Sequence, residues 1–177
     1  STFRVELELR YGTQPEKSSQ QEKTSLATAE TNPLKGLKVL VAEDNDINAE
    51  ILEELLSFEG VSCDRAVNGQ EALERFRQTP PGYYDAVLMD IQMPIMNGYE
   101  TARAIRDLDR SDAAAIPIVA MTANAFADDV KNSMEAGMNE HLSKPIDMTA
   151  LKDVLEKLIC SEHRNVQNKS DGAGQDN

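Results

Sequence analysis

Apolar runs alternate with helical patterns five times between residues 35 and 160. The runs are apolar at consecutive positions, whereas the helical patterns repeat apolar residues every three or four positions, as in Ile47, Ile51 and Leu55. Strands that are apolar on both faces are typical of a parallel sheet covered by helices on both sides. We therefore expect an α/β domain with a doubly wound, five-stranded parallel sheet, since crossovers between parallel strands are right-handed. The expected strands are 37–42, 61–66, 85–89, 116–121 and 140–143, and the best-bounded helices are 69–78, 98–108 and 127–136.

The two ends of the chain have other patterns. Residues 2–10 alternate strictly between polar and apolar side chains, which predicts a half-buried strand within 1–11 that either lacks its partner strands in this chain or lies loose. Residues 12–34 are mostly polar and predict a flexible linker. Residues 161–177 are equally polar and predict a disordered tail. The folded domain is thus expected to span 35–160.

Composition narrows the classes of partner. The formal net charge of −13 argues against binding to nucleic acid or to an anionic membrane surface, because both require a basic surface. No apolar run approaches the roughly 20 residues that span a bilayer. The two cysteines, Cys63 and Cys160, lie far apart without metal-ligand spacing, which fits a reducing cytoplasm. We expect a cytoplasmic domain that is a monomer in isolation.

Polar residues stand at the carboxyl ends of the expected strands. Glu43 and Asp44 follow the first strand, Asp90 the third, Thr122 the fourth and Lys144 the fifth. In a doubly wound sheet, ligands bind in the crevice beyond these ends. The sequence therefore predicts that three carboxylates, a hydroxyl and an ammonium group converge on one edge of the sheet.

Each of these residues also has a simpler interpretation. Asp44 or Asn45 could cap the first helix, Asp90 could be a turn residue, Thr122 could cap the fourth helix, and Lys144 with the following proline could merely precede the last helix. Their joint occurrence favours a site, because two carboxylates about 4 Å apart repel by ~4 kcal/mol at an effective dielectric constant near 20. Such a cluster requires a cation, and oxygen ligands of this kind suit Mg²⁺.

The charges also suit phosphoryl chemistry. Three carboxylates and one lysine sum to −2, which one Mg²⁺ neutralises. An acyl phosphate on Asp90 adds about one further negative charge, which Lys144 and a hydrogen bond from Thr122 could stabilise. Positioning and charge neutralisation suffice for this chemistry, so no histidine of this chain is required.

With these residues in place, the sequence resembles the receiver domains of two-component response regulators, above all those fused to hybrid histidine kinases. The resemblance covers about 125 residues and rests on four motifs, which are 39–48 (VLVAEDNDIN), 88–98 (LMDIQMPIMNG), 121–123 (MTA) and 142–145 (LSKP). It implies a flavodoxin-like fold with strand order 2-1-3-4-5, an order for which a member of the family is a standard example. Residues 1–11 resemble the last strand of a histidine-kinase ATP-binding domain, which leaves open whether a parent kinase is anchored in a membrane.

The resemblance also assigns roles to residues. It implies that Asp90 is phosphorylated and that Mg²⁺ (or Mn²⁺) binds to Glu43, Asp44, Asp90 and the main-chain carbonyl of Gln92. Thr122 and Lys144 match the switch hydroxyl and the phosphoryl-binding lysine of the family. The aromatic switch position, three residues before the lysine, is His141 here, which puts the usual rotameric readout in doubt.

The implied function is phosphorelay signal transduction, in which Mg²⁺-dependent phosphorylation of Asp90 by a phosphohistidine either switches the conformation of the domain or precedes transfer of the phosphoryl group to a histidine phosphotransfer domain. The expected partners are the phosphodonor domain of a histidine kinase and a histidine phosphotransfer domain, and no kinase activity is expected in this chain. Two alternative functions require residues that differ from those of this chain. A haloacid-dehalogenase-like phosphatase would need a second aspartate two positions after the nucleophile, where this chain has Gln92. A degenerate receiver that only binds protein would lack part of the acidic and lysine set, which is complete here.

Overall fold

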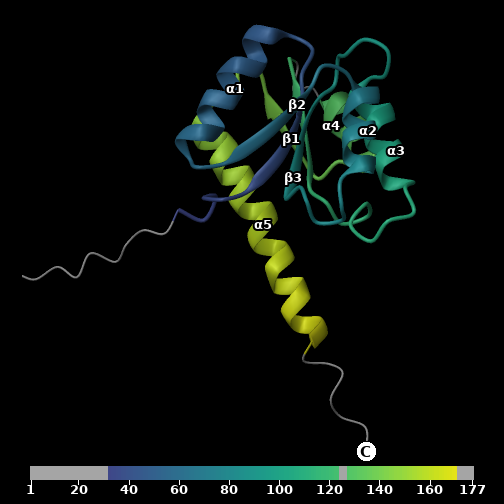
Figure 1. Ribbon diagram of the computed structural model, residues 1–177. Coiled ribbons are helices and arrows are strands. Elements are labelled where there is room, and N and C mark those ends of the chain that lie inside the picture. The colour runs from purple at the N-terminus through teal and green to yellow at the C-terminus, as the bar shows by residue number, and fades with distance from the viewer. Residues whose placement is uncertain (1–31, 124–126, 171–177) are drawn as a thin grey trace, which may run out of the picture. The chain divides into compact units, whose positions relative to one another are not determined.

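The computed structural model describes residues 32–123 and 127–170, and these form a single sheet flanked by helices (Figure 1). The five strands are all parallel in the order β2-β1-β3-β4-β5, so the predicted fold class and strand order are confirmed. The strands are β1 (Lys38–Ala42), β2 (Ser62–Ala66), β3 (Ala86–Asp90), β4 (Ile118–Thr122) and β5 (Glu140–Ser143). The helices are α1 (Asp46–Phe58), α2 (Gly69–Gln78), α3 (Gly98–Arg106), α4 (Ala127–Glu135) and α5 (Met148–Ser170).

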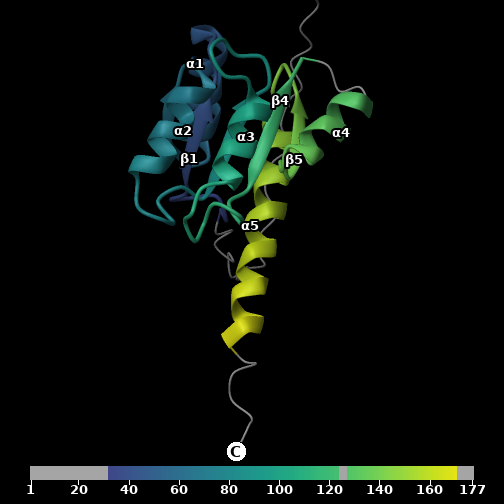
Figure 2. The ribbon, with the colours of Figure 1, turned by 90° about the vertical axis from the view of Figure 1, so that its right-hand side faces the viewer.

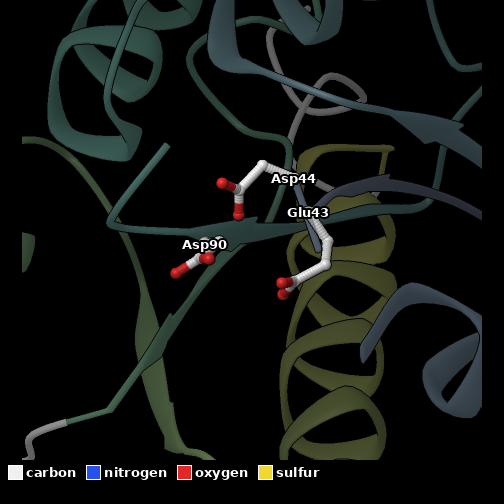
Figure 3. Close-up of side chains that lie close together, drawn as sticks. All are labelled: Glu43, Asp44 and Asp90. Atoms are coloured by element: carbon white, nitrogen blue, oxygen red, sulfur yellow. The ribbon is translucent and has the colours of Figure 1, made fainter. Parts of the chain in front are cut away.

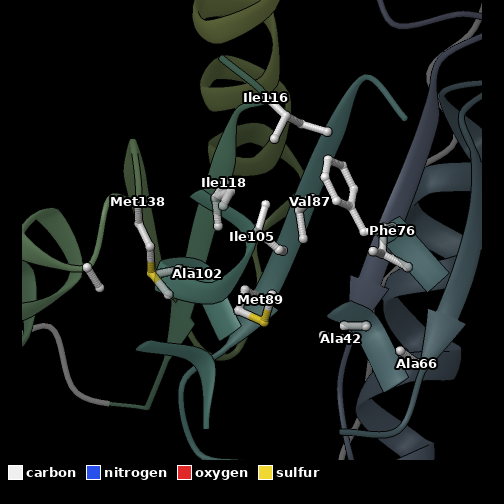
Figure 4. Packing of buried hydrophobic residues seen from close by; sticks show 14 of the residues in the cluster. Ala42, Ala66, Phe76, Val87, Met89, Ala102, Ile105, Ile116, Ile118 and Met138 are labelled. Carbon is white, nitrogen blue, oxygen red and sulfur yellow. The ribbon is translucent and has the colours of Figure 1, made fainter. Parts of the chain in front are cut away.

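Two apolar layers form because the central strands are buried on both faces. β1 alternates its side chains between the layers, with Leu40 on one side and Val39 and Val41 on the other. The layer that contains Leu40 is closed by α2 and α3 and by residues that follow α4, and Phe76 and Ile105 are its largest helical side chains (Figure 4). The other layer is closed by α1 and α5 through Leu52, Leu56, Leu151 and Leu155.

The amino-terminal boundary of the domain differs from the prediction. Leu34 was expected to end a flexible linker, but its side chain is 1% exposed and packs in the layer under α1 and α5. Asn32 donates hydrogen bonds from Nδ2 to the main-chain oxygen of Glu59 at 2.9 Å and to its Oε2 at 2.7 Å. The prediction was wrong for residues 32–34, because one leucine in a polar stretch can be a core residue. The expected strand 1–11 and the rest of the linker lie outside the described residues.

The carboxyl-terminal boundary also differs. α5 continues to Ser170, ten residues into the segment that polar composition predicted to be disordered, and it runs past the end of the sheet in both views (Figure 2). A physical reason is that residues 161–170 contain neither glycine nor proline, and Gly172 is the next helix-breaking residue. Residues 171–177 lie outside the described part. No helix in the described ranges is both long enough and apolar enough to cross a bilayer.

Candidate functional site

An acidic cluster lies at the carboxyl edge of the sheet (Figure 3). Glu43 and Asp44 follow β1, and Asp90 is the last residue of the neighbouring strand β3. One carboxylate oxygen from each lies within 4.8 Å of the other two. Glu43 and Asp90 are 1% and 6% exposed, whereas Asp44 is open to solvent. The structure therefore brings together the three carboxylates that the strand pattern placed at this edge.

Lys144 holds two members of the cluster. Its Nζ donates to Oε2 of Glu43 at 2.5 Å and to Oδ2 of Asp90 at 2.7 Å. Its main-chain N–H bonds to the carbonyl of Thr122 at 2.7 Å, which continues the pairing of β4 and β5 beyond Ser143. Three carboxylates and one ammonium group leave a formal charge of −2 in a partly buried site.

Burial and pairing act in opposite directions on the buried groups. Burial raises the pKa of Asp90 most strongly and the charge of Glu43 adds to this, while the Lys144 ammonium and the N–H of Gln92 lower it, so the pKa of Asp90 is raised overall. Burial lowers the pKa of Lys144, but its bonds to Asp90 and Glu43 more than offset this and the pKa is raised overall. Lys144 therefore keeps its positive charge at neutral pH.

The main chain around Asp90 approaches α3 closely. A Cβ atom on Gly98 would lie 2.4 Å from the carbonyl oxygen of Asp90, so only glycine fits at this position. Gly98 also donates its N–H to the carbonyl of Ile91 at 3.0 Å. Gln92 donates its N–H to Oδ1 of Asp90 at 3.2 Å. These contacts fix the end of β3, and the proposed metal-ligand role of the Gln92 carbonyl stays a prediction.

Two asparagines hold the loop from β1 to α1: Asn45, one of the two candidate caps, and Asn48, for which no role was predicted. Asn45 caps α1, with its Oδ1 accepting from the N–H groups of Ile47 and Asn48, so Asp44 is not the cap. Oε1 of Glu43 accepts from Nδ2 of Asn48 at 3.0 Å. The Asn-x-x-Asn spacing, which places the cap and Asn48 on the same first turn, was the available signal.

The two switch residues of the prediction lie on neighbouring strands. Thr122 is buried at the end of β4, and His141 is on β5, where it pairs in register with Ala120. Nδ1 of His141 is buried, and no group among residues 32–123 and 127–159 forms a hydrogen bond with it. Because residues 124–126 lie outside the described part, the switch roles of Thr122 and His141 stay predictions.

The carboxylate set fits a divalent cation of the Mg²⁺ type. Mg²⁺ takes oxygen ligands, keeps several waters and uses few carboxylates together with phosphate oxygens. Here Asp44 offers a solvent-exposed oxygen beside two buried carboxylates. One Mg²⁺ ion would neutralise the formal charge of −2 that Lys144 leaves on the cluster. Glu43, Asp44 and Asp90 could therefore hold the ion without rearrangement of the sheet.

Comparisons with known proteins agree with this geometry. Residues 39–156 match the family model described as the response regulator receiver domain. Hybrid signal transduction histidine kinase L of Dictyostelium discoideum is 37% identical over 141 residues, which are 78% of this chain and 8% of that protein. The chain thus spans a small part of the curated relatives that it matches, between 6% and 14% of their lengths.

Two solved structures carry further information. The receiver domain of the sensor histidine kinase PA1611 from Pseudomonas aeruginosa, with magnesium in its active-site cleft, is 34% identical, with a TM-score of 0.63 over 70% of this chain and 98% of that one. The receiver domain of Ssk1 from Saccharomyces cerevisiae, solved with the histidine phosphotransfer protein Ypd1, is 33% identical, with a TM-score of 0.64 over 71% and 90% of the two chains. With its fold, its acidic cluster and its matching family model, this chain belongs to the response regulator receiver domain family.

Proposed function

We propose that this domain accepts a phosphoryl group from a phosphohistidine onto Asp90 as a step of a phosphorelay. The observation that carries the proposal is the buried Asp90 carboxylate, which is bound by the Lys144 ammonium at 2.7 Å and lies within 4.8 Å of two further carboxylates. A buried carboxylate with this surrounding charge is an unusual structural element, and its chemistry matches a phosphoryl acceptor.

The proposed step conserves atoms and charge. An oxygen of the Asp90 carboxylate forms a bond to phosphorus while the bond from phosphorus to the donor's imidazole nitrogen breaks, and the imidazole takes up a proton from water. Mg²⁺, when bound, neutralises the phosphoryl oxygens. Lys144 retains its proton because its pKa is raised, so it can pair with the phosphoryl group that adds about one negative charge. Thr122, at the end of the neighbouring strand β4, would donate its hydroxyl to a phosphoryl oxygen.

A partner surface adjoins the acidic cluster. A cavity of about 310 Å³ opens beside Glu43 and Lys144 and is otherwise lined by Asn48, Ile51, Leu52, Met121, Pro145 and Ile146. Ile47 and Ile51 on α1 are 69% and 52% exposed. Exposed apolar side chains next to a polar site indicate protein contact. A histidine phosphotransfer domain, the class of protein bound to the yeast receiver above, is the partner that would present a phosphohistidine here.

Two experiments test the proposal: phosphorylation by a small molecule and phosphoryl transfer from a partner protein. Intact-mass spectrometry after incubation with a small-molecule phosphodonor and Mg²⁺ should show one added phosphoryl group on the wild type and none on Asp90→Asn. Asp153→Asn on α5 is the matched control and should be phosphorylated like the wild type. A phosphorylated histidine phosphotransfer domain should transfer to the wild type faster than to Ile51→Glu. Addition to Asp90→Asn, or no addition to the wild type, would overturn the proposal.

A further inference from the structure

Arg65 joins the edge strand β2 to the loop that carries the acidic pair. Its Nε and Nη2 donate to the main-chain carbonyl oxygen of Glu43 at 3.3 and 3.2 Å, and Nη2 also donates to Oδ1 of Asp46 at 2.7 Å. The N–H of Glu43 bonds to the carbonyl of Ala66 on the same strand at 3.0 Å. Both main-chain polar groups of Glu43 are thus held by β2.

This contact fixes the peptide unit between Glu43 and Asp44. A peptide group is planar, so a carbonyl oxygen held from one side sets the direction in which the next residue leaves. No side chain or main-chain group among the described residues forms a hydrogen bond with the Asp44 carboxylate. Within the described part of the chain, the main chain therefore sets the direction in which the Asp44 side chain leaves, and the Arg65 side chain holds the carbonyl of the preceding peptide unit.

We propose that Arg65 is a positioning residue for the divalent-cation site, acting through the Glu43 carbonyl rather than through its charge. The inference rests on the proposed metal-binding role of Glu43, Asp44 and Asp90. The ion pair with Asp46 contributes little to this role, because the Asp46 side chain is 88% exposed and exposed pairs are screened by water. The guanidinium fork, by contrast, presents two donors to one carbonyl and is itself only 23% exposed.

Charge and geometry predict opposite results when Arg65 is replaced. Removal of a positive charge near a cation site should tighten Mg²⁺ binding, because the guanidinium repels the ion. Loss of the contact with the Glu43 carbonyl should weaken Mg²⁺ binding. Residues that orient metal ligands without binding the metal themselves typically change the metal affinity 10- to 100-fold when they are replaced. We expect the second effect to dominate in Arg65→Met, with the Mg²⁺ dissociation constant raised about tenfold.

Mg²⁺ titration of the full chain, followed by amide NMR shifts and by calorimetry, distinguishes these effects. Asp46→Asn removes the ion pair but keeps the two donors on the Glu43 carbonyl, so its dissociation constant should change much less than that of Arg65→Met. Arg65→Lys retains the charge but not the two-donor fork, and it should fall between the wild type and Arg65→Met. Melting temperatures in EDTA show whether each variant is folded.

The outcomes separate the inference from the proposed function. Absence of saturable Mg²⁺ binding in the wild type would overturn the metal site itself. Wild-type binding with an unchanged or tighter dissociation constant in folded Arg65→Met would overturn the positioning role alone. The same holds if Asp46→Asn weakens binding as much as Arg65→Met, since the ion pair would then account for the effect. Should Arg65→Met not fold, a wild-type dissociation constant in Arg65→Lys overturns the role and a raised one supports it.

Discussion

Replacement of Asp44 by asparagine should stabilise the metal-free protein. Asp44 is exposed and makes no hydrogen bond to a described residue, so the change removes a charge from the acidic cluster without breaking a buried contact. Its carboxylate has an oxygen within 4.8 Å of oxygens on Glu43 and Asp90. At that separation each pair repels by about 3.5 kcal/mol at an effective dielectric constant of 20 and by about 0.9 kcal/mol in bulk water.

The net stabilisation is smaller than the sum of the two repulsions on Asp44 at either dielectric constant. The Lys144 ammonium, which is bound to both buried carboxylates, offsets roughly one of the two repulsions on Asp44. The exposure of Asp44 places the remaining pair near the lower, water-like limit. We therefore expect Asp44→Asn to raise the free energy of unfolding by about 1 kcal/mol in EDTA at low salt, which corresponds to about 3 °C in melting temperature.

In excess Mg²⁺, the wild type should be more stable than Asp44→Asn, the reverse of the order in EDTA. A ligand that binds only the folded state stabilises it by about 2.7 kcal/mol at 100 times its dissociation constant, and Asp44→Asn forfeits part of this gain. Thermal melts of both proteins in EDTA and in excess Mg²⁺ test the reversal. Glu50→Gln, an exposed change of the same charge on α1, is the control and should alter neither melt appreciably. A melting temperature of Asp44→Asn in EDTA at or below that of the wild type, or an equal gain from Mg²⁺, would refute the reasoning.

Three further changes test other parts of the structure by chemical denaturation or thermal melting. Leu34→Ala should lower the free energy of unfolding by about 3 kcal/mol, whereas a chain that begins at Thr31 should be as stable as the full chain. Equal stability of Leu34→Ala and wild type would show that Leu34 is not a core residue. Ile95→Asn should stabilise by about 1 kcal/mol, because Ile95 is 76% exposed with φ of 71°, a conformation that asparagine tolerates and a β-branched residue does not. In the absence of metal, the stability of Asp90→Asn relative to wild type should increase as the pH rises from below about 3.9 through the raised pKa of Asp90. The reason is that ionisation of this carboxyl group in the folded state lowers the free energy of unfolding of the wild type. A constant difference in stability across this pH range would contradict the raised pKa.

The sheet and the convergence of its polar strand ends could be predicted because they follow from periodicity. Doubly apolar strands require helices on both faces, and parallel strands place all their carboxyl ends on one edge. Lys144 could therefore be placed beside Asp90, although 54 positions separate them in sequence. Strand and helix ends differed from prediction by one or two residues, as where β4 begins at Ile118 rather than 116, because end positions depend on pairing with neighbours.

The contacts that support the site could not be predicted in the same way. Arg65 is a polar residue on the surface of a strand, and nothing in its position along the sequence shows that it binds the main chain of Glu43. The spacing of Asn45 and Asn48 places both on the first turn of α1 but does not show that the Asn48 side chain binds that of Glu43. Leu34 lies in a polar stretch, so its burial depends on the shape of the layer under α1 and α5. The contact of Arg65 depends on the tertiary structure, which brings it to Glu43 across 22 positions of the sequence.

The hydrogen bonds of Asp90 indicate which of its oxygens would attack phosphorus in the proposed transfer. Oδ2 accepts from the Lys144 ammonium at 2.7 Å, a charge-assisted bond that withdraws electron density from that oxygen. Among the residues that the structure describes, Oδ1 accepts only from the neutral N–H of Gln92, at the longer distance of 3.2 Å. A long, neutral hydrogen bond restrains an oxygen less than a short, charged one, so Oδ1 keeps more of its nucleophilic character while Lys144 holds the carboxylate in place. Because Lys144 also binds Glu43 at 2.5 Å, it need give up only that second bond to meet the incoming phosphoryl charge.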